Sequence, residues 1–207
     1  MADNKEDEAL KVLVEIVSCE LTPSQEILNS EPNKTKLYDV CCICELSSKE
    51  IHRTSYIHKT IEPIWTINTK SLFLLRTTTS KLQSGLTFSI LHDSGLLKLG
   101  KVGKSSLSSF GSINVPYETI ISCKRNRLDF DVKPSDFSRD HGIDPKLALR
   151  FDIADEKDEE FISQYQNQSL KQETMRTSFA NAAKHKTIKM SHKKRDKMDR
   201  NIELVRQ

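Results

Sequence analysis

The chain lacks any apolar stretch long enough to cross a bilayer. Apolar runs such as residues 10–17 and 71–75 are far shorter than the ~20 residues that a membrane-spanning helix needs. The first ten residues are acidic and show neither the cationic start nor the apolar core of a secretory signal. We therefore expect neither secretion nor a transmembrane span.

Apolar residues are scarce overall. They make up 36% of the 207 residues, and charged residues make up 29%, whereas an ordinary globular chain is about 45–50% apolar with glycine included. This composition is too apolar for disorder throughout, and too polar for every residue to surround one core. It predicts a compact domain of about 140 residues with a polar tail.

Catalytic motifs are absent. Glycines 100 and 103 have the wrong spacing for a phosphate-binding loop, and the chain has no Gly-x-Ser-x-Gly or His-Glu-x-x-His motif. Nothing in the sequence orients His141 toward Cys123 as a catalytic pair. We therefore predict no enzyme activity, no catalytic residues, no cofactor and no small-molecule substrate.

The five cysteines are odd in number and lie inside apolar runs. Without a secretory signal, they are interpreted as reduced, small core residues in a reducing compartment. Cys41, Cys42 and Cys44 have no second Cys or His pair at zinc-finger spacing. No metal site is therefore predicted.

Up to residue 154, short segments rich in β-branched residues alternate or run apolar, as β-strands do. Eight strands are expected, and residues 116–123 are expected to form a short helix between two of them. No long helix-periodic run interrupts the series, which disfavours a βαβ architecture. The prediction is an all-β, eight-stranded antiparallel sandwich with strands at 10–21, 38–46, 50–58, 64–75, 86–93, 99–107, 127–133 and 147–154.

After residue 154 the pattern becomes helical. Residues 156–185 lack Gly and Pro, and Asp155 is placed to cap the start of a helix. We predict an acidic, disordered N-terminus at 1–8, the sandwich at 9–154, and a helical, partly disordered basic extension at 155–207.

Residues 9–154 resemble a C2 domain, the eight-stranded sandwich family that binds phospholipids, often with calcium. The most specific piece is the Thr-x-x-Pro-x-Trp stretch that ends at Trp65 and leads into an apolar strand, with residues 86–102 and 147–153 in matching order. Trp65 is expected to pack at a sandwich edge, because it carries a large apolar area. The strand after Trp65 departs from the family pattern and is expected to be interrupted or bulged.

The resemblance implies calcium sites only where the loops concentrate carboxylates, because calcium takes six to eight oxygen ligands. His92 and Ser94 stand where the family's calcium-binding members have aspartates, and Asp93 is expected to point to the other side of the strand. In the first loop, isolated acids stand among lysines. We therefore predict calcium independence.

Without calcium, two apolar residues beside lysines could meet a membrane while the ammonium groups bind lipid phosphates. The predicted lipid contacts are Leu96, Leu97, Lys98 and Lys101, with Arg53 and Lys59 as weaker candidates. The leucines could instead cover the end of the sandwich. Alternation along 50–58 would place Arg53 and His58 on opposite faces, as on an ordinary solvated edge.

Charge is distributed unevenly along the chain. Residues 152–170 carry six acids against one lysine, and residues 171–207 carry eleven Lys or Arg against four acids. With a total of +3, residues 1–151 are left with a net charge of +1. This asymmetry assigns electrostatic binding to the tail, through Lys184, Lys186, Lys189, Lys193, Lys194, Arg195 and Lys197.

Three functions stay open. The first is a calcium-independent module that binds an anionic phospholipid membrane or a membrane-associated protein, with a cytoplasmic, peripheral-membrane location. The second is a protein-interaction adaptor that uses the sandwich and the C-terminal helix. The third is a nuclear or nucleic-acid-associated protein that acts through the basic tail, although the tail lacks aromatic residues to stack on bases between 184 and 198.

Overall fold

The computed structural model describes residues 7–24, 36–93 and 107–165, and every structural statement below refers to these residues. The chain divides into two compact units, Met1–Glu159 and Glu160–Gln207. The first unit contains the β-sheets. Of the second unit, the structure describes only the six residues 160–165, which are helical.

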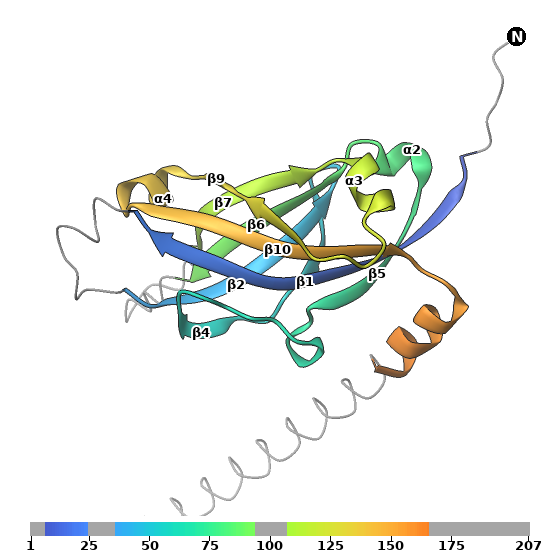
Figure 1. Cartoon of the computed structure of the whole chain (residues 1–207), viewed down its shortest axis with the longest axis horizontal. Helices are drawn as coiled ribbons and strands as arrows, with labels where there is room; N and C mark the ends of the chain where they lie inside the picture. Colours follow the sequence, from blue (N-terminus) through green and yellow to red (C-terminus); the bar gives the residue numbers. More distant parts are fainter. Residues whose placement is uncertain (1–6, 25–35, 94–106, 166–207) are drawn as a thin grey trace, which may run out of the picture. The chain divides into compact units, whose positions relative to one another are not determined.

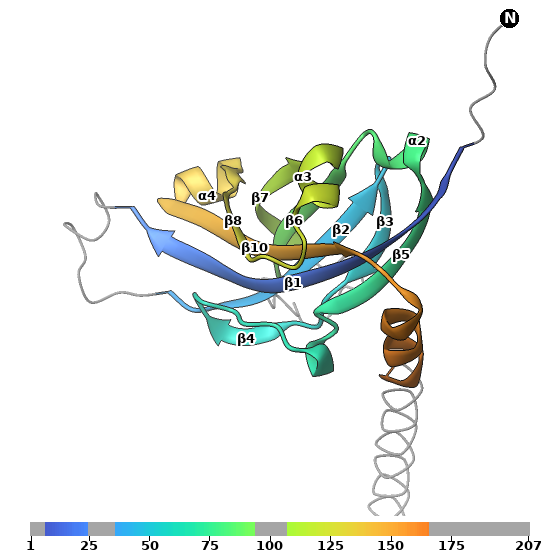
Figure 2. The same cartoon turned by 45° about the vertical axis from the view of Figure 1, so that its right-hand side comes forward.

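The first sheet has four strands in the order β5-β1-β10-β8, and all of its paired strands are antiparallel. We call it sheet A. Strands β1 and β10 run side by side along most of their length (Figures 1 and 2). Sheet A consists of β1 (Ala9–Pro23), β5 (Leu72–Thr78), β8 (Leu128–Asp131) and β10 (Ile143–Ile153).

The second sheet, sheet B, has the order β3-β2-β6-β7-β9, and β4 also pairs with β2. Its strands β2 and β6 pass behind β1 and β10 in both views (Figures 1 and 2). Sheet B consists of β2 (Tyr38–Leu46), β3 (Lys49–Arg53), β4 (Ile57–Thr60), β6 (Leu86–Asp93), β7 (Leu107–Val115) and β9 (Lys133–Pro134).

Helices are few and short in the described first unit. They are the 3-10 helix η1 (Ile67–Thr69), α2 (Thr79–Leu82), α3 (Tyr117–Ser122) and α4 (Asp136–Asp140). Residues 156–165 are also helical. The Asp155 side chain accepts a hydrogen bond from the Asp158 N–H at 2.9 Å, so the predicted helix cap is confirmed.

The core forms because inward and outward residues alternate along the strands. In β6 the alternation is strict: Leu86, Phe88, Ile90 and His92 are buried, and the residues between them are partly exposed. In β1 a register shift between Ile16 and Ser18 moves the inward set from even to odd numbers. The two inner faces therefore meet in one apolar cluster, and the predicted all-β antiparallel sandwich is confirmed.

Several strand boundaries differ from prediction, and the described residues contain ten strand segments rather than eight. The segment 50–58 is two strands, because buried Thr54 exchanges hydrogen bonds with the backbone of Cys42 and the chain then turns. The segment predicted at 64–75 contains η1, and β5 begins only at Leu72, which confirms the expected interruption after Trp65. Helix α3 lies within the predicted 116–123.

Strand β7 was predicted at 99–107 but begins at Leu107 and continues to Val115; residues 99–106 lie outside the described structure. Gly111 explains why a serine-rich segment forms a strand here. A Cβ on Gly111 would lie 2.2 Å from the Lys133 carbonyl oxygen, so only glycine allows β9 to approach β7 this closely.

Trp65 is 3% exposed, and its indole N–H donates to the Ser55 carbonyl at 3.1 Å. Its predicted role as a packing residue is confirmed. All five cysteines are buried and unbonded to one another. Four belong to the core cluster, whereas Cys41 is absent from that cluster although it is fully buried. In the part of the chain that is described, no helix is long and apolar enough to span a membrane.

Candidate functional site

One end of the sandwich is built from strand ends that flank residues 25–35 and 94–106. There β1 ends at Pro23, β2 begins at Tyr38, and β6 and β7 pair through Asp93 and Leu107. Helix α4 lies at the same end, at the left of Figure 1. We call this region the loop end.

Two large apolar side chains are exposed at the loop end. Leu37, directly before β2, is 53% exposed, and Leu107, the first residue of β7, is 39% exposed. Lys36 precedes Leu37, and its ammonium group lies 5.4 Å from the centre of the Tyr38 ring. The loop end therefore presents apolar side chains next to a positive charge.

A cluster of rings supports this surface from inside. Tyr38 meets His92 and Phe110 edge to face, with centroids 5.0 Å apart in both pairs. Phe137 of α4 lies 5.4 Å from Phe110 and 4.2 Å from His141. The His92 Nδ1–H donates to the Asp39 carbonyl at 3.2 Å. Edge-to-face aromatic packing has a defined geometry, so the strand ends are held on a rigid support.

Lys59, a predicted lipid contact, lies on β4 with a φ of 53°. The Asp39 carboxylate holds this left-handed conformation, because its Oδ1 accepts the Lys59 backbone N–H at 2.9 Å. That hydrogen bond, together with the nearby His58, lowers the pKa of Asp39. The Lys59 side chain is exposed, and no ion pair to it occurs among the described carboxylates.

Arg53, the other described lipid candidate, is already paired. Its guanidinium donates two hydrogen bonds to the Glu50 carboxylate, at 2.9 and 2.7 Å. This bidentate pair neutralises Arg53 and raises its pKa above the usual range. The structure therefore distinguishes the two described candidates, because Arg53 is paired with Glu50 and the Lys59 side chain has no carboxylate partner among the described residues.

The prediction that alternation would place Arg53 and His58 on opposite faces is wrong, because they belong to different strands. Arg53 pairs in register with Ile43, and His58 Nδ1 lies 3.3 Å from Asp39 Oδ1. Asp39 and Ile43 share one face of β2, so both basic residues approach that same face.

The remaining predicted contacts lie outside the described residues. They are Leu96, Leu97, Lys98 and Lys101 of the loop after β6, and Lys184, Lys186, Lys189, Lys193, Lys194, Arg195 and Lys197 of the tail. The same holds for Ser94 and for the acids of the first loop. His92 and Asp93 are described, and they point to opposite sides of β6 as expected, with His92 buried among the aromatic rings.

Within residues 7–24, 36–93 and 107–165, no three His, Cys, Asp or Glu side chains come together as a metal site. Asp39 is engaged with Lys59 and His58, and the neighbouring His92 is inside the ring cluster. The described rim of the loop end is thus rich in exposed apolar and basic groups and poor in clustered carboxylates.

Lys36, Leu37 and Leu107 were missed by sequence reasoning. The pattern that predicted Leu96, Leu97 and Lys98 as lipid contacts is an apolar residue next to a lysine beside a strand. Lys36-Leu37 has the same pattern at the start of β2. Leu107 offered no such signal, because it was placed at the end of a strand rather than at its beginning.

Comparisons with known proteins bear on the fold alone. No protein-family model matches the chain, and no curated protein is similar to it. Among solved structures, the chain is similar to the C2A domain of a plant extended synaptotagmin 1, with 14% identity over 71% of this chain and 97% of that chain and a TM-score of 0.43. It is also similar to the C2A and C2B domains of extended synaptotagmin 2, with 12% identity over 74% and 45% of the two chains and a TM-score of 0.48.

A third solved structure is described as "CC2D1B coordinates ESRCT-III activity during the mitotic reformation of the nuclear envelope". Its identity is 14% and its TM-score 0.45, and the match covers 72% of this chain and 57% of that one. The chain thus spans about half of the length of two of these three structures. Two of these solved structures are described as C2A and C2B domains, the family that residues 9–154 resemble in sequence.

Proposed function

We propose that this chain is a non-enzymatic, calcium-independent C2-like module whose loop end binds anionic phospholipid membranes. The observation that carries the proposal is the exposure of Leu37 and Leu107 at the end of the sandwich that also carries Lys36 and Lys59, and neither lysine has an ion pair among the described residues. The proposal gives the protein a cytoplasmic, peripheral-membrane location.

The chemistry of the loop end suits an interface of apolar chains and phosphates. Exposed leucines gain free energy by leaving water for the acyl-chain boundary. A lysine near an anionic membrane contributes about 1 kcal/mol, and the aliphatic stem of a lysine can lie along apolar surface while its ammonium group stays at the headgroups. Lys36 and Lys59 are the described lysines positioned for this role.

Calcium independence is supported by the contacts that Asp39 already makes and by the position of His92. A calcium ion needs six to eight oxygens, and Asp39 already accepts the Lys59 N–H and lies beside His58. His92, which stands at a position where the resemblance would require an aspartate, is enclosed by aromatic rings. The binding energy is therefore proposed to come from lysines and leucines.

The test is co-sedimentation of the full chain with phosphatidylserine-containing vesicles in a calcium chelator. The variant K36Q/L37N/K59Q should lose most of the binding. The control K49Q/I121N/K81Q likewise changes two lysines and one exposed aliphatic residue, all away from the loop end, and it should bind like the wild type. Equal loss in both variants would contradict the loop-end proposal, and binding that appears only with added calcium would contradict calcium independence.

The basic segment 171–207 is a second proposed membrane contact, because two weak attachments to one surface reinforce each other. Deleting it should weaken vesicle binding and leave the effect of K36Q/L37N/K59Q in place. If only the deletion matters, the sandwich does not bind membranes. If the intact chain binds duplex DNA with a steep salt dependence and ignores vesicles, the nucleic-acid function replaces the membrane function.

A further inference from the structure

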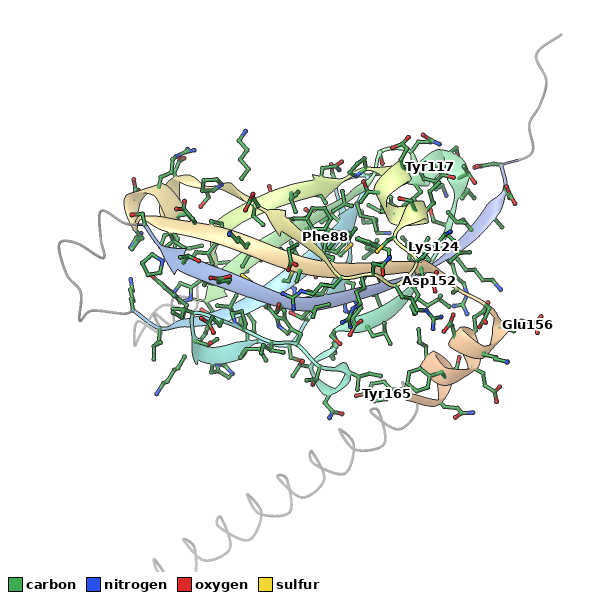
Figure 3. The ribbon with its side chains drawn as sticks, viewed as in Figure 1. Phe88, Tyr117, Lys124, Asp152, Glu156 and Tyr165 are labelled. Carbon is green, nitrogen blue, oxygen red and sulfur yellow. The ribbon has the colours of Figure 1, made fainter. Side chains whose placement is uncertain are left out.

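At the end of the sandwich opposite the loop end, basic side chains hold two acidic residues of the same chain. Arg125, between α3 and β8, donates to both Asp158 oxygens at 2.7 Å. It also donates to Asp152 at 2.5 Å. Asp152 and the neighbouring Lys124 are labelled in Figure 3. A single guanidinium thus joins the end of β10 to the first turn of the helix at 156–165.

Glu159 is held in the same way by two other strands. Its carboxylate contacts Lys11 of β1, and it accepts a hydrogen bond from Arg76 of β5 at 3.2 Å. Lys11 and Arg76 are opposite each other in the antiparallel ladder. Together the two bases lower the pKa of Glu159.

The basic groups are positioned by the fold rather than by the acids. Lys11 and Arg76 extend from paired strands. The Arg125 backbone N–H donates to the Phe151 carbonyl at 2.9 Å, and the Cys123 thiol donates to the Asn126 carbonyl. These contacts hold Lys124 and Arg125 at positive φ, 47° and 62°. The loop is therefore fixed before any acid binds to it.

A groove of about 340 Å³ adjoins Arg125. Its charged lining consists of two ion pairs, Arg125 with Asp152 and Arg150 with Glu15, and its apolar lining consists of Leu13, Leu72 and Phe151. Its volume is at the lower end of the range for ligand pockets, about 300–1,000 Å³. A recess with an apolar lining beside a guanidinium suits a peptide, whereas a bilayer surface is too flat to enter it.

We propose that Lys11, Arg76 and Arg125 form a binding surface for an acidic segment of a partner protein, which Asp158 and Glu159 of this chain occupy when no partner is present. We call these groups the basic surface and the acidic pair. The partner's segment carries two neighbouring carboxylates. Arg125 binds both oxygens of one carboxylate, and Lys11 and Arg76 together bind the next. This proposal does not depend on membrane binding.

The ion pairs between the basic surface and the acidic pair are weak enough for a partner's carboxylates to replace Asp158 and Glu159. The side chains of Lys11, Arg76 and Arg125 are about half exposed or more, and exposed ion pairs are individually weak and screened by salt. An acidic partner segment that also fills the groove makes contacts that the acidic pair lacks. The partner can therefore displace the acidic pair without unfolding the sandwich.

The test uses the full chain and a synthetic peptide with the sequence of residues 154–165. Peptide binding is followed by shifts in the backbone NMR signals of Lys11, Arg76 and Arg125 at low salt. The variant D158N/E159Q should bind the peptide several-fold more tightly than the wild type, because its basic surface is vacated. Adding R125Q to that variant should remove the gain, and a peptide with Asn and Gln at the two acidic positions should not bind.

The matched control is E8Q/E118Q, which makes the same change in net charge at the same end of the sandwich. Neither residue forms an ion pair within the described part of the chain, so this variant should bind the peptide as weakly as the wild type. Equal affinities for the wild type and D158N/E159Q would overturn the proposal, as would an equal gain in the control. A gain in D158N/E159Q for phosphatidylserine vesicles and not for the peptide would assign the basic surface to membranes and would also overturn it.

Discussion

The two ends of the sandwich carry similar basic residues in opposite states. At the loop end, no described carboxylate pairs with the Lys36 or Lys59 side chain. At the far end, Lys11, Arg76 and Arg125 all contact carboxylates of residues 152–159. The net charge of residues 1–151 is only +1, so net charge does not reveal the basic residues at either end.

The difference teaches that a basic residue is available to a partner only when its own chain leaves it unpaired. Arg53 makes the same point within one region, because Glu50 neutralises it at short range while Lys59 stays exposed. Charge counts along the sequence therefore rank candidate surfaces poorly. The predictions below test how far the two ends are independent, in order of decreasing effect.

Trp65→Ala should destabilise both ends of the sandwich together, because it opens a cavity in the core that both ends share. Trp65 is 3% exposed, and truncation of a buried tryptophan costs about 3–5 kcal/mol of unfolding free energy. Urea denaturation measures this loss. Leu37→Ala, at an exposed position, is the control and should change stability only slightly; similar midpoints for both variants would show that Trp65 is not a core residue.

Gly111→Ala should destabilise mainly the loop end. The new methyl group would meet the Lys133 carbonyl oxygen at 2.2 Å, and overpacking of this kind costs about 1–3 kcal/mol. The β7–β9 pairing and the docking of α4 should loosen, because Ser135 and Ser138 bond to the backbone of Ser109 and Phe110.

Hydrogen exchange localises this effect. Amides of β7 and α4 should exchange faster in Gly111→Ala, while amides of the Arg125 loop should keep their protection. Ser112→Ala, at the exposed neighbouring position, is the control. Uniform loss of protection at both ends would show that the two ends unfold as one cooperative unit.

His52 should make stability depend on pH at a site away from both ends. Its Nε2–H donates to the Lys70 carbonyl at 2.7 Å and its ring stacks on Phe73 with centroids 4.0 Å apart. Burial lowers its pKa below 6.5, so the folded protein favours the neutral ring. Stability should be full above the unfolded pKa and should fall as the pH drops through 6.5 toward the folded pKa, by up to about 1.4 kcal/mol per pH unit.

His52→Gln keeps a donor for Lys70 and does not titrate. Thermal unfolding between pH 7 and pH 5 should therefore show a shallower decline in this variant than in the wild type. Identical slopes would mean that His52 binds protons equally well in the folded and unfolded chains.

Arg125→Gln should have the smallest effect, about 0.5–1 kcal/mol, because its ion pairs are exposed. The loss should shrink in high salt, where exposed charges are screened. Lys124→Gln is a close control, since Lys124 is adjacent, also has positive φ, and contacts no carboxylate in the part of the chain described. Equal losses in the two variants would mean that the ion pairs of Arg125 with Asp152 and Asp158 do not contribute to stability.

Local pattern predicted much of this fold correctly. Short alternating or apolar segments located β1, β2 and β6 almost to the residue, because a strand with one or both faces buried leaves such a pattern in the sequence. Asp155 was predicted as a helix cap for an equally local reason. Strand β7 was misplaced, because its serines become a strand only through pairing with β6 and β9.

The candidate surfaces depended on contacts between residues far apart in the sequence. The sequence offered no reason to prefer Arg53 or Lys59 as a lipid contact. In the structure, Glu50 pairs with the Arg53 side chain, whereas Asp39 binds only the backbone N–H of Lys59. The basic surface unites residues 11, 76 and 125, and no spacing rule connects them.

Alternation, composition and caps report on a residue and its close neighbours in the chain, and these were enough for an antiparallel sandwich with an acidic and then basic extension. Which charges are neutralised, which leucines stay in water and which thiols enter the core depend on partners that folding brings from distant positions. Cys41 illustrates this difference: alternation places it on the face of β2 opposite Cys42 and Cys44, outside their cluster, and yet folding buries it completely. Electrostatic and packing energies depend on distance in space, and a linear pattern does not contain that distance.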